Sequence, residues 1–202
     1  MAQKQRYAAV VLAAGKGSRM NAPVKKQYLY IENKPVLYYS LSVFEACPFI
    51  DEIILVTGGD EIEYCHDEIV NKYNFKKVSG IVAGGKERYH SVYEGLKALT
   101  ECSYVYIHDG ARPFIDQEML ARAGEAVRKY GACVVGMPVK DTIKISDLEG
   151  FADTTPNRDL VWMIQTPQVF AYNLIKSAHS KIMEGKDILV TVRGKGYKLC
   201  ID

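Results

Sequence analysis

The sequence lacks the patterns that would place a chain in a membrane, outside the cell or on a nucleic acid. No apolar run reaches the roughly 18 residues that a membrane-spanning helix needs. Residues 1–6 lead into the first apolar run without the apolar centre of a secretory signal. The formal net charge of +2 is too small to indicate a nucleic acid or an anionic membrane as partner. We therefore expect a cytoplasmic protein with no nucleic-acid and no membrane partner.

Cysteine and histidine are too scattered to form a disulfide framework or a zinc site. The five cysteines are odd in number and none of them form a C-x-x-C pair, so reduced thiols are expected. The four histidines show no metal-ligand spacing. What remains is an ordinary globular composition, 48% hydrophobic and 25% charged. A chain of 202 residues is long enough for one substantial domain with its own core.

Apolar runs alternate with segments of helical spacing along the chain. The runs predict strands at residues 7–12, 52–57, 76–82, 104–108 and 132–137. The segments between and after them predict helices at residues 36–46, 60–73, 88–99, 117–130 and 173–184. Such alternation is typical of βαβ units. We predict an α/β fold over residues 1–202, with a mostly parallel twisted sheet and helices on both of its faces.

Residues 139–160 interrupt this alternation. They are polar and contain a glycine, a proline and several β-branched residues, which predicts strands at 139–145 and 151–155 around a turn at 147–150. A hairpin with so little apolar surface is not stable alone. We therefore expect this hairpin to pack on another surface, for which a second subunit is the natural candidate.

A loop of small residues follows the first predicted strand. Its residues with little or no side chain, whose backbone N–H groups can approach a ligand closely, are Ala13, Ala14, Gly15 and Gly17. Arg19 and Lys26 are cations that could meet phosphate oxygens. The loop matches neither common phosphate-binding pattern, because no Gly-Lys-Ser follows Lys16 and Met20 replaces the third glycine of the dinucleotide fingerprint. The loop suits a nucleoside triphosphate; the alternative is a tight turn beside surface cations.

Four more motifs follow this loop in order. The first stretch, residues 12–20 with Lys26-Gln27-Tyr28, is followed by motifs at residues 84–92, 108–114, 138–144 and 165–168. Together they resemble the sugar-phosphate nucleotidyltransferases, and among these the 2-C-methyl-D-erythritol 4-phosphate cytidylyltransferase family. The resemblance covers about residues 7–184 and implies a Rossmann-like nucleotidyltransferase fold with a protruding β-arm. In that family the segment that matches residues 139–160 is the arm, which embraces the partner of a homodimer and contributes to its active site. It also implies an enzyme of non-mevalonate isoprenoid biosynthesis that transfers CMP from CTP to 2-C-methyl-D-erythritol 4-phosphate and releases pyrophosphate.

The resemblance further implies roles for single residues. Arg19 and Lys26 would stabilise the pentacoordinate α-phosphate, and Arg158 on the partner's arm would position the acceptor phosphate. Nucleotide contacts would come from Ala13, Ala14, Gly15, Gly17, Lys26, Gly84, Gly85 and Ser91. Substrate contacts would come from Asp109, Arg112, Thr142, Arg158 and Thr166. Asp109 could instead hold the Mg²⁺, or another divalent cation, that accompanies the triphosphate.

These roles have plainer alternatives. Asp109 and Arg112 could form a salt bridge that shapes a turn, and Thr142 and Thr166 could be ordinary strand threonines. His108 is expected to be a structural histidine and not a base. A competing function is that of a ribitol-5-phosphate cytidylyltransferase, which has a similar arm.

The C-terminal region departs from the resembled family. Val192-Arg193 replaces an acidic pair, and the family's later Asn-Ile-Lys segment and final helix have no counterpart. That lysine normally holds the acceptor phosphate. We therefore expect a shortened or divergent C-terminal region, which leaves open a CTP-binding protein with impaired turnover.

Overall fold

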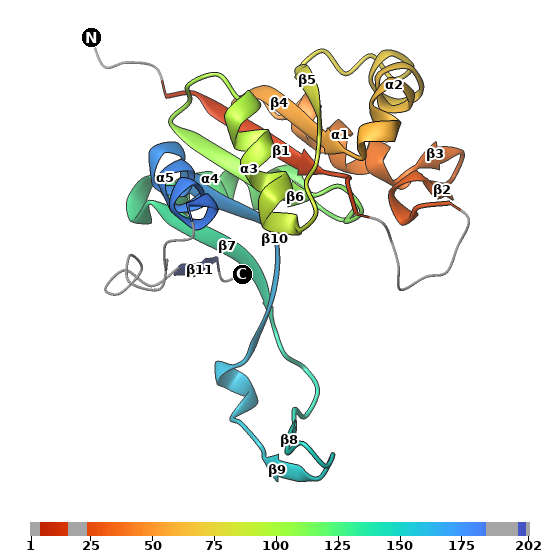
Figure 1. Ribbon diagram of the computed structural model, residues 1–202. Helices are drawn as coiled ribbons and strands as arrows, with labels where there is room; N and C mark the ends of the chain where they lie inside the picture. The colour runs from red at the N-terminus through yellow and green to blue at the C-terminus, as the bar shows by residue number, and fades with distance from the viewer. Residues whose placement is uncertain (1–4, 16–23, 185–197, 201–202) are drawn as a thin grey trace.

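The computed structural model describes residues 5–15, 24–184 and 198–200 (Figure 1). A seven-stranded sheet forms its centre, with strand order β11-β7-β10-β6-β1-β4-β5. Its members are β1 (Tyr7–Leu12), β4 (Ile50–Thr57), β5 (Val78–Ala83), β6 (Tyr104–Asp109), β7 (Ala132–Pro138), β10 (Trp162–Ala171) and β11 (Lys198–Cys200). β10 runs antiparallel to both of its neighbours, whereas the other pairs are parallel. The predicted α/β fold with a mostly parallel sheet is confirmed.

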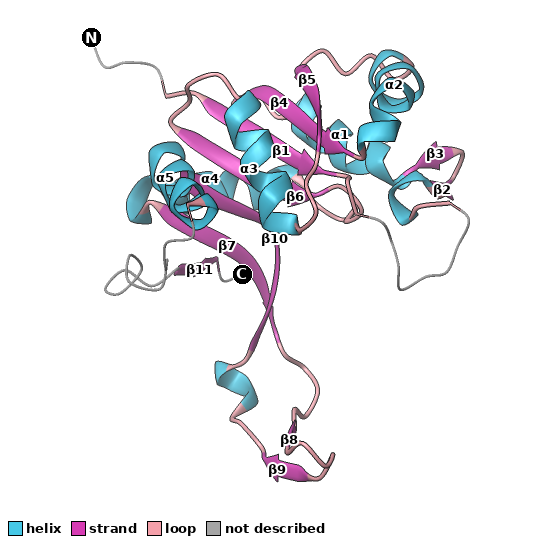
Figure 2. Cartoon of the chain, viewed as in Figure 1, coloured by secondary structure: helices cyan, strands magenta, loops and turns pink. Residues whose placement is uncertain are grey.

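Helices cover both faces of this sheet (Figure 2). On one face lie α1 (Val36–Ala46) and α4 (Gln117–Tyr130), and on the other lie α3 (Arg88–Ala98) and α5 (Tyr172–Met183). Alternate side chains of β1 serve the two faces: Ala9 and Val11 pack with α1 and α4, while Ala8 and Val10 pack with α3. A strand buried on both faces must be apolar throughout, which is why β1 reads as one continuous apolar run.

Smaller elements fill the connections. After β4 come the 3₁₀ turn η2 (Gly59–Glu61), the single turn α2 (Ile62–Tyr64) and the π-helix η3 (Cys65–Asn71). The remaining elements are the 3₁₀ turns η1 (Lys26–Tyr28) and η4 (Arg158–Leu160) and two small hairpins, β2 (Tyr30–Ile31) with β3 (Lys34–Pro35) and β8 (Ile145–Ser146) with β9 (Ala152–Thr154). No helix in the described ranges is long and apolar enough to cross a membrane.

An arm extends from the body between β7 and β10 (Figure 1). Its stem is the antiparallel pairing of Met137 with Met163 and of Pro138 with Trp162. One further backbone bond, from the Val139 N–H to the Val161 carbonyl at 3.0 Å, follows the stem. Beyond it the chain opens, and at the tip β8 pairs with β9. The protruding arm is therefore present, but the strand predicted at 139–145 is wrong for all but Ile145, because its polar residues find no neighbouring strand to pair with.

Candidate active site

A cavity of about 660 Å³ lies at the carboxyl ends of β1 and β6, beside the start of α3. In open α/β sheets this edge is where ligands bind. The predicted nucleotide residues that line it are Ala13, Ala14, Gly15, Lys26, Gly85 and Ser91, and the lining also includes Asp109 and Arg112. Gly17 and Arg19 lie outside the described residues, so their predicted roles stay predictions. The structure thus brings together residues from motifs almost 100 positions apart.

The loop after β5 approaches the loop after β1 very closely at Gly84. A Cβ atom placed there would lie 2.5 Å from the Cβ of Ala14 and 2.7 Å from the Oγ of Ser91. Only glycine allows this spacing without moving one of the loops. The Ser91 hydroxyl accepts from the Gly85 N–H at 3.1 Å and lies 3.4 Å from the Glu87 carbonyl. Ser91 therefore shapes the loop whose backbone faces the cavity.

The buried Gln27 side chain anchors the loop that follows β1. This side chain is 1% exposed, and its Nε2 donates to the carbonyls of Ala13 at 2.5 Å and Gly15 at 3.2 Å. The Ala13 N–H donates to the Val56 carbonyl at 2.6 Å, so a ligand could meet only the backbone N–H groups that follow Ala13 in this loop. This role of Gln27 was not predicted, because the sequence shows it only as the middle residue of the Lys-Gln-Tyr motif.

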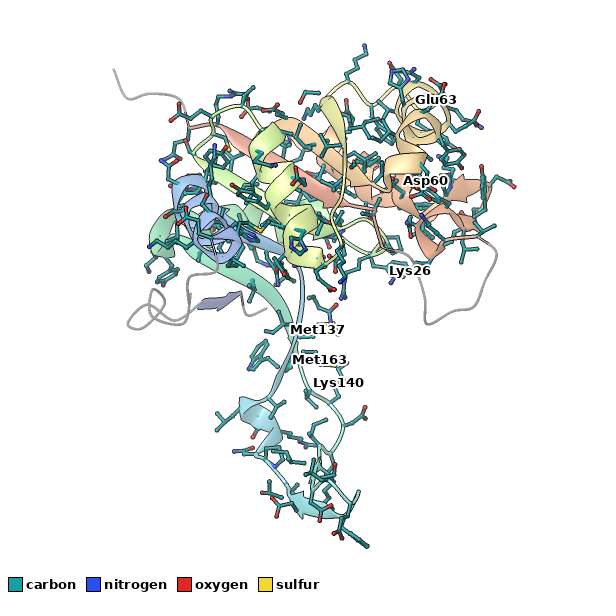
Figure 3. All side chains as sticks on the ribbon, viewed as in Figure 1. Lys26, Asp60, Glu63, Met137, Lys140 and Met163 are labelled. Carbon is teal, nitrogen blue, oxygen red and sulfur yellow. The ribbon has the colours of Figure 1, made fainter. Side chains whose placement is uncertain are left out.

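The residues flanking Lys26 are fixed as well. Tyr28 is buried, and its hydroxyl lies 2.9 Å from Thr57 Oγ1 and 3.2 Å from Cys65 Sγ. Burial raises the pKa of the Tyr28 phenol far above its usual value, so it stays a neutral hydroxyl. Lys25 forms an ion pair of 2.8 Å with Glu61. Lys26 is thereby held as an exposed cation at the cavity edge (Figure 3).

Asp109 is bracketed by two arginines. Its Oδ1 accepts from Arg88, with Nη2 at 3.0 Å and Nε at 3.1 Å, and its Oδ2 accepts from Arg112 Nε at 3.1 Å. The three groups together carry a formal charge of +1, which favours an anion in the cavity. The predicted Asp109–Arg112 ion pair is present. Arg88 was missed, although it belongs to the motif at residues 84–92.

The same geometry bears on the predicted metal role of Asp109. Both of its carboxylate oxygens are already engaged by guanidinium groups. Among the described residues no group of three His, Cys, Asp or Glu side chains is gathered that could hold an ion. As arranged, Asp109 does not fit a magnesium ligand, and its predicted contact to substrate stays a prediction.

A second cavity, of about 440 Å³, lies at the base of the arm. It shares Ala111 and Arg112 with the first cavity and is lined further by Gly136, Met137 and Thr166. Figure 3 shows Met137 and Met163 at the point where β7 and β10 leave the body. Arg112 also donates to Gln165 Oε1. We call this hollow the arm-base pocket; it adjoins the first cavity at Ala111 and Arg112.

The two predicted arm residues lie elsewhere. Thr142 and Arg158 are exposed on the arm, and Arg158 Nη1 donates to the Lys140 carbonyl at 3.4 Å. Neither residue lines a cavity with Asp109 or Arg112 of the same chain. Within one chain the structure therefore does not bring them to the predicted site.

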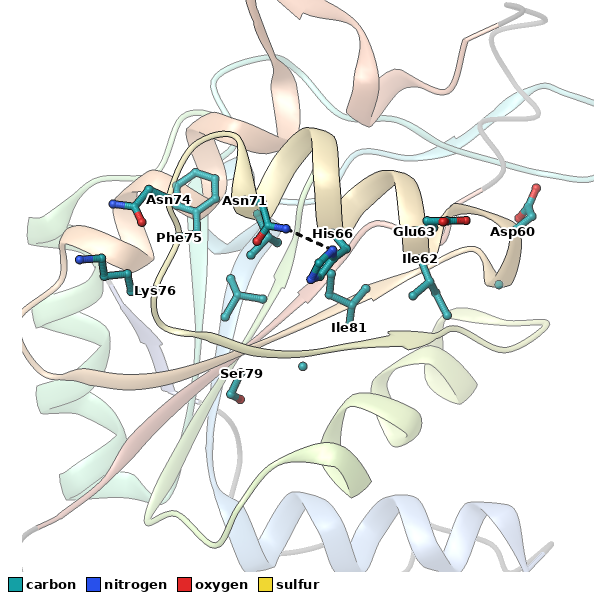
Figure 4. Close-up of a pocket in the computed structure, with 14 residues that line it drawn as sticks. Asp60, Ile62, Glu63, His66, Asn71, Asn74, Phe75, Lys76, Ser79 and Ile81 are labelled. Atoms are coloured by element: carbon teal, nitrogen blue, oxygen red, sulfur yellow. Dashed lines mark hydrogen bonds between the residues drawn. The ribbon is translucent and has the colours of Figure 1, made fainter.

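A larger hollow, of about 920 Å³, runs along β5 beneath α2 and η3 (Figure 4). Its lining includes Asp60, Glu63, His66 and Lys76, and the His66 ring lies 3.2 Å from the Asn71 amide. None of the predicted site residues that the structure describes line it. Its size alone does not make it the site, because the charged groups that suit phosphates converge elsewhere.

The fold and the two adjoining cavities define a nucleotide-binding α/β protein of the nucleotidyltransferase class, with loop amides and cations at the carboxyl ends of its strands. The chain belongs to the 2-C-methyl-D-erythritol 4-phosphate cytidylyltransferase family, whose sequence pattern matches residues 7–192.

Relatives and solved structures agree with this assignment. The chain is 52% identical over 183 residues to the enzyme of that name from Clostridium kluyveri, covering 91% of this chain and 79% of the relative. It is 46% identical over 196 residues to the one from Caldanaerobacter subterraneus, covering 95% and 86%. The crystal structure of 4-diphosphocytidyl-2C-methyl-D-erythritol synthase from Anaerococcus prevotii is similar with a TM-score of 0.83 and 33% identity, covering 96% and 86%.

Proposed function

We propose that this chain is the enzyme that transfers CMP from CTP to 2-C-methyl-D-erythritol 4-phosphate and releases pyrophosphate. One observation carries the proposal: two adjoining cavities meet at Arg112, one lined by small loop residues and Lys26, the other at the base of the arm. The first suits a nucleoside triphosphate and the second a small phosphorylated polyol. The family to which the chain belongs uses this pair of substrates.

The reaction is attack by an oxygen of the acceptor phosphate on the α-phosphorus of CTP. The new P–O bond forms as the bond between the α-phosphorus and the bridging oxygen breaks, and pyrophosphate leaves. Both reactants are anions, so fixed cations must hold them together. The described cations that line the first cavity are Lys26, Lys86, Arg88 and Arg112, and Arg122 joins Arg112 in the arm-base pocket. Of these, Lys26, Arg88 and Arg112 would act where negative charge builds up on the transferring group.

The arm supplies the remaining predicted groups from a second copy of the chain. Leu148, Phe151 and Leu160 are between 69% and 107% exposed on the arm, more apolar surface than a solitary arm would carry. In a homodimer they would be covered, and Thr142 and Arg158 would reach the partner's arm-base pocket. Mg²⁺ would enter with the triphosphate, and no step is assigned to a metal held by the described residues.

Pyrophosphate release with CTP and each candidate acceptor tests the proposal. We expect turnover with 2-C-methyl-D-erythritol 4-phosphate and much less with ribitol 5-phosphate. CTP should also raise the melting temperature more than ATP, GTP or UTP, because a ligand bound only to the native state stabilises it. Turnover with ribitol 5-phosphate alone would favour the competing transferase, and a CTP-specific shift without turnover would favour a CTP-binding protein.

A further inference from the structure

We propose that His108 is a positioning residue for the acceptor substrate, which fixes Arg112 and Thr166 through one tautomer of its ring. The proposal rests on the proposed function, because these two residues are its acceptor contacts. His108 lies on β6, 0% exposed, with its ring edge-on to Phe44 at a centroid distance of 5.5 Å. Because it is fully buried, His108 cannot contact a ligand itself and acts only through its neighbours Arg112 and Thr166.

The hydrogen-bond partners determine the tautomer. Nε2 lies 3.1 Å from the carbonyl oxygen of Arg112, and a carbonyl can only accept, so Nε2 carries the hydrogen. Burial lowers the pKa of His108 to about 4, and the ring is neutral at ordinary pH. Nδ1 is then an acceptor, and it lies 2.9 Å from Thr166 Oγ1. The Thr166 hydroxyl therefore donates its one proton to His108.

This arrangement decides what Thr166 can offer a ligand. Its Oγ1 also accepts from the Asp109 backbone N–H at 3.2 Å, so the proton and one lone pair are both used. Thr166 lines the arm-base pocket with only a lone pair left. It can accept from a hydroxyl of the acceptor polyol, but it cannot donate to a phosphate oxygen. The acceptor phosphate is thereby left to guanidinium groups, that of Arg112 in this pocket and that of Arg158 on the arm of a second copy.

His108 also fixes the backbone that carries this guanidinium. The Arg112 carbonyl accepts from His108, and the buried Ser40 hydroxyl on α1 lies 3.2 Å from the same oxygen. The Arg112 N–H closes the turn by donating to the Asp109 carbonyl at 2.9 Å. The turn is therefore held from the core, while the Arg112 side chain stays 44% exposed toward the cavities. A change at His108 should disturb the acceptor side before the nucleotide side.

Three substitutions separate the two contacts. His108→Phe keeps the ring shape but leaves the Thr166 hydroxyl and the Arg112 carbonyl without their partner. We expect the acceptor KM to rise about ten- to a hundredfold, with CTP affinity within about twofold of the parent. His108→Asn places its polar atoms near Nδ1 and should restore the Thr166 contact, whereas His108→Gln reaches toward Nε2 and should restore the Arg112 contact. Partial recovery by each would support the proposal.

Thr166 and His179 supply the matched controls. Thr166→Val removes the hydroxyl that bonds to His108, so it should raise the acceptor KM and add little to His108→Phe. His179, also buried at 8% exposure and stacked on Tyr93, tests the loss of a buried ring in general. His179→Phe should leave the acceptor KM unchanged.

Two results would overturn the proposal. Equal loss of CTP and acceptor affinity in the His108 variants would make the residue purely structural, and unchanged acceptor kinetics would deny it any role. Acceptor binding measured by calorimetry with a non-hydrolysable CTP analogue gives the same comparison without turnover. Failure of the parent protein to turn over would thus count against the proposed function, while the binding comparison would still decide the role of His108.

Discussion

At the scale of single residues, buried polar side chains set the geometry of the cavity. Gln27→Leu would remove the two donors that hold the Ala13 and Gly15 carbonyls. We expect a loss of about 1–3 kcal/mol in the free energy of unfolding, because buried carbonyls would be left unpaired. We also expect weaker CTP binding, measured by calorimetry.

Gln117 offers the control for this change. Its Nε2 also donates to a backbone carbonyl, that of Val43 at 2.7 Å, but on the exposed surface of α4. Gln117→Leu should leave CTP binding unchanged and cost less stability. Similar CTP affinity in the two variants would show that Gln27 does not position the loop.

His108 also makes stability depend on pH. In the unfolded chain it binds a proton below its ordinary pKa of about 6.5, but in the folded chain only below about 4. Between these values the unfolded state binds more protons, so stability is lost as the pH falls from about 6.5 to about 4. The difference between the two pKa values corresponds to a loss of about 3 kcal/mol in the free energy of unfolding once the pH is below about 4. Denaturant unfolding at pH 7.5 and pH 5 should show a smaller fall for His108→Asn than for the parent; an equal fall would contradict the burial argument.

At the scale of elements, the sequence correctly predicted the helices and strands whose apolar residues repeat with a regular period. β1, α1 and α4 have the predicted bounds, because their apolar residues follow one period from end to end. β10 was missed, since Gln165, Thr166 and Pro167 in its middle read as a loop, and its pairing with β7 is irregular there. The helix predicted at 60–73 is a 3₁₀ turn, one α turn and a π-helix, and no residue pattern distinguishes these.

In the candidate site, too, some residues were predictable from the sequence and others were not. Strand-end residues such as Asp109 and Arg112 were predicted because their position follows from the order of strands and loops. The supporting contacts of Gln27 and His108 could not be predicted, because each joins segments that only the folded sheet brings together. The C-terminal divergence falls mainly on residues 185–197, outside the described residues.

The contact between the β1 and β5 loops gives an element-scale prediction. Gly84→Ala would place a methyl group 2.5 Å from the Cβ of Ala14, so one loop must move. Overpacking of this kind usually costs about 1–3 kcal/mol in the free energy of unfolding. We also expect the displaced loop to bind CTP more weakly, as measured by calorimetry. Gly59→Ala is the control, because its methyl group would meet only Ala83 at an ordinary 3.8 Å. Equal CTP affinities of the Gly84→Ala and Gly59→Ala variants would mean that the two loops can move apart without weakening CTP binding.

At the scale of the whole molecule, the arm decides whether one chain can hold a complete site. Thr142 and Arg158 lie on the arm, away from the cavities of their own body. If the arm serves the partner, Lys26→Ala and Arg158→Ala subunits should complement each other. The heterodimer would contain one body with Lys26 facing an arm with Arg158, and one site that lacks both.

Random mixing makes half of the dimers mixed, so about a quarter of the sites should be intact. We expect pyrophosphate release in the mixture to approach about a quarter of the parent's rate, while each variant alone stays far below it. Subunit exchange is verified first, by native mass spectrometry of subunits of different mass. Exchange without recovered activity would place Arg158 in the site of its own chain, which requires the arm to fold back onto its own body. The paired stem of β7 and β10, with both its methionines nearly half exposed, directs the arm away from that body and therefore favours recovery of activity.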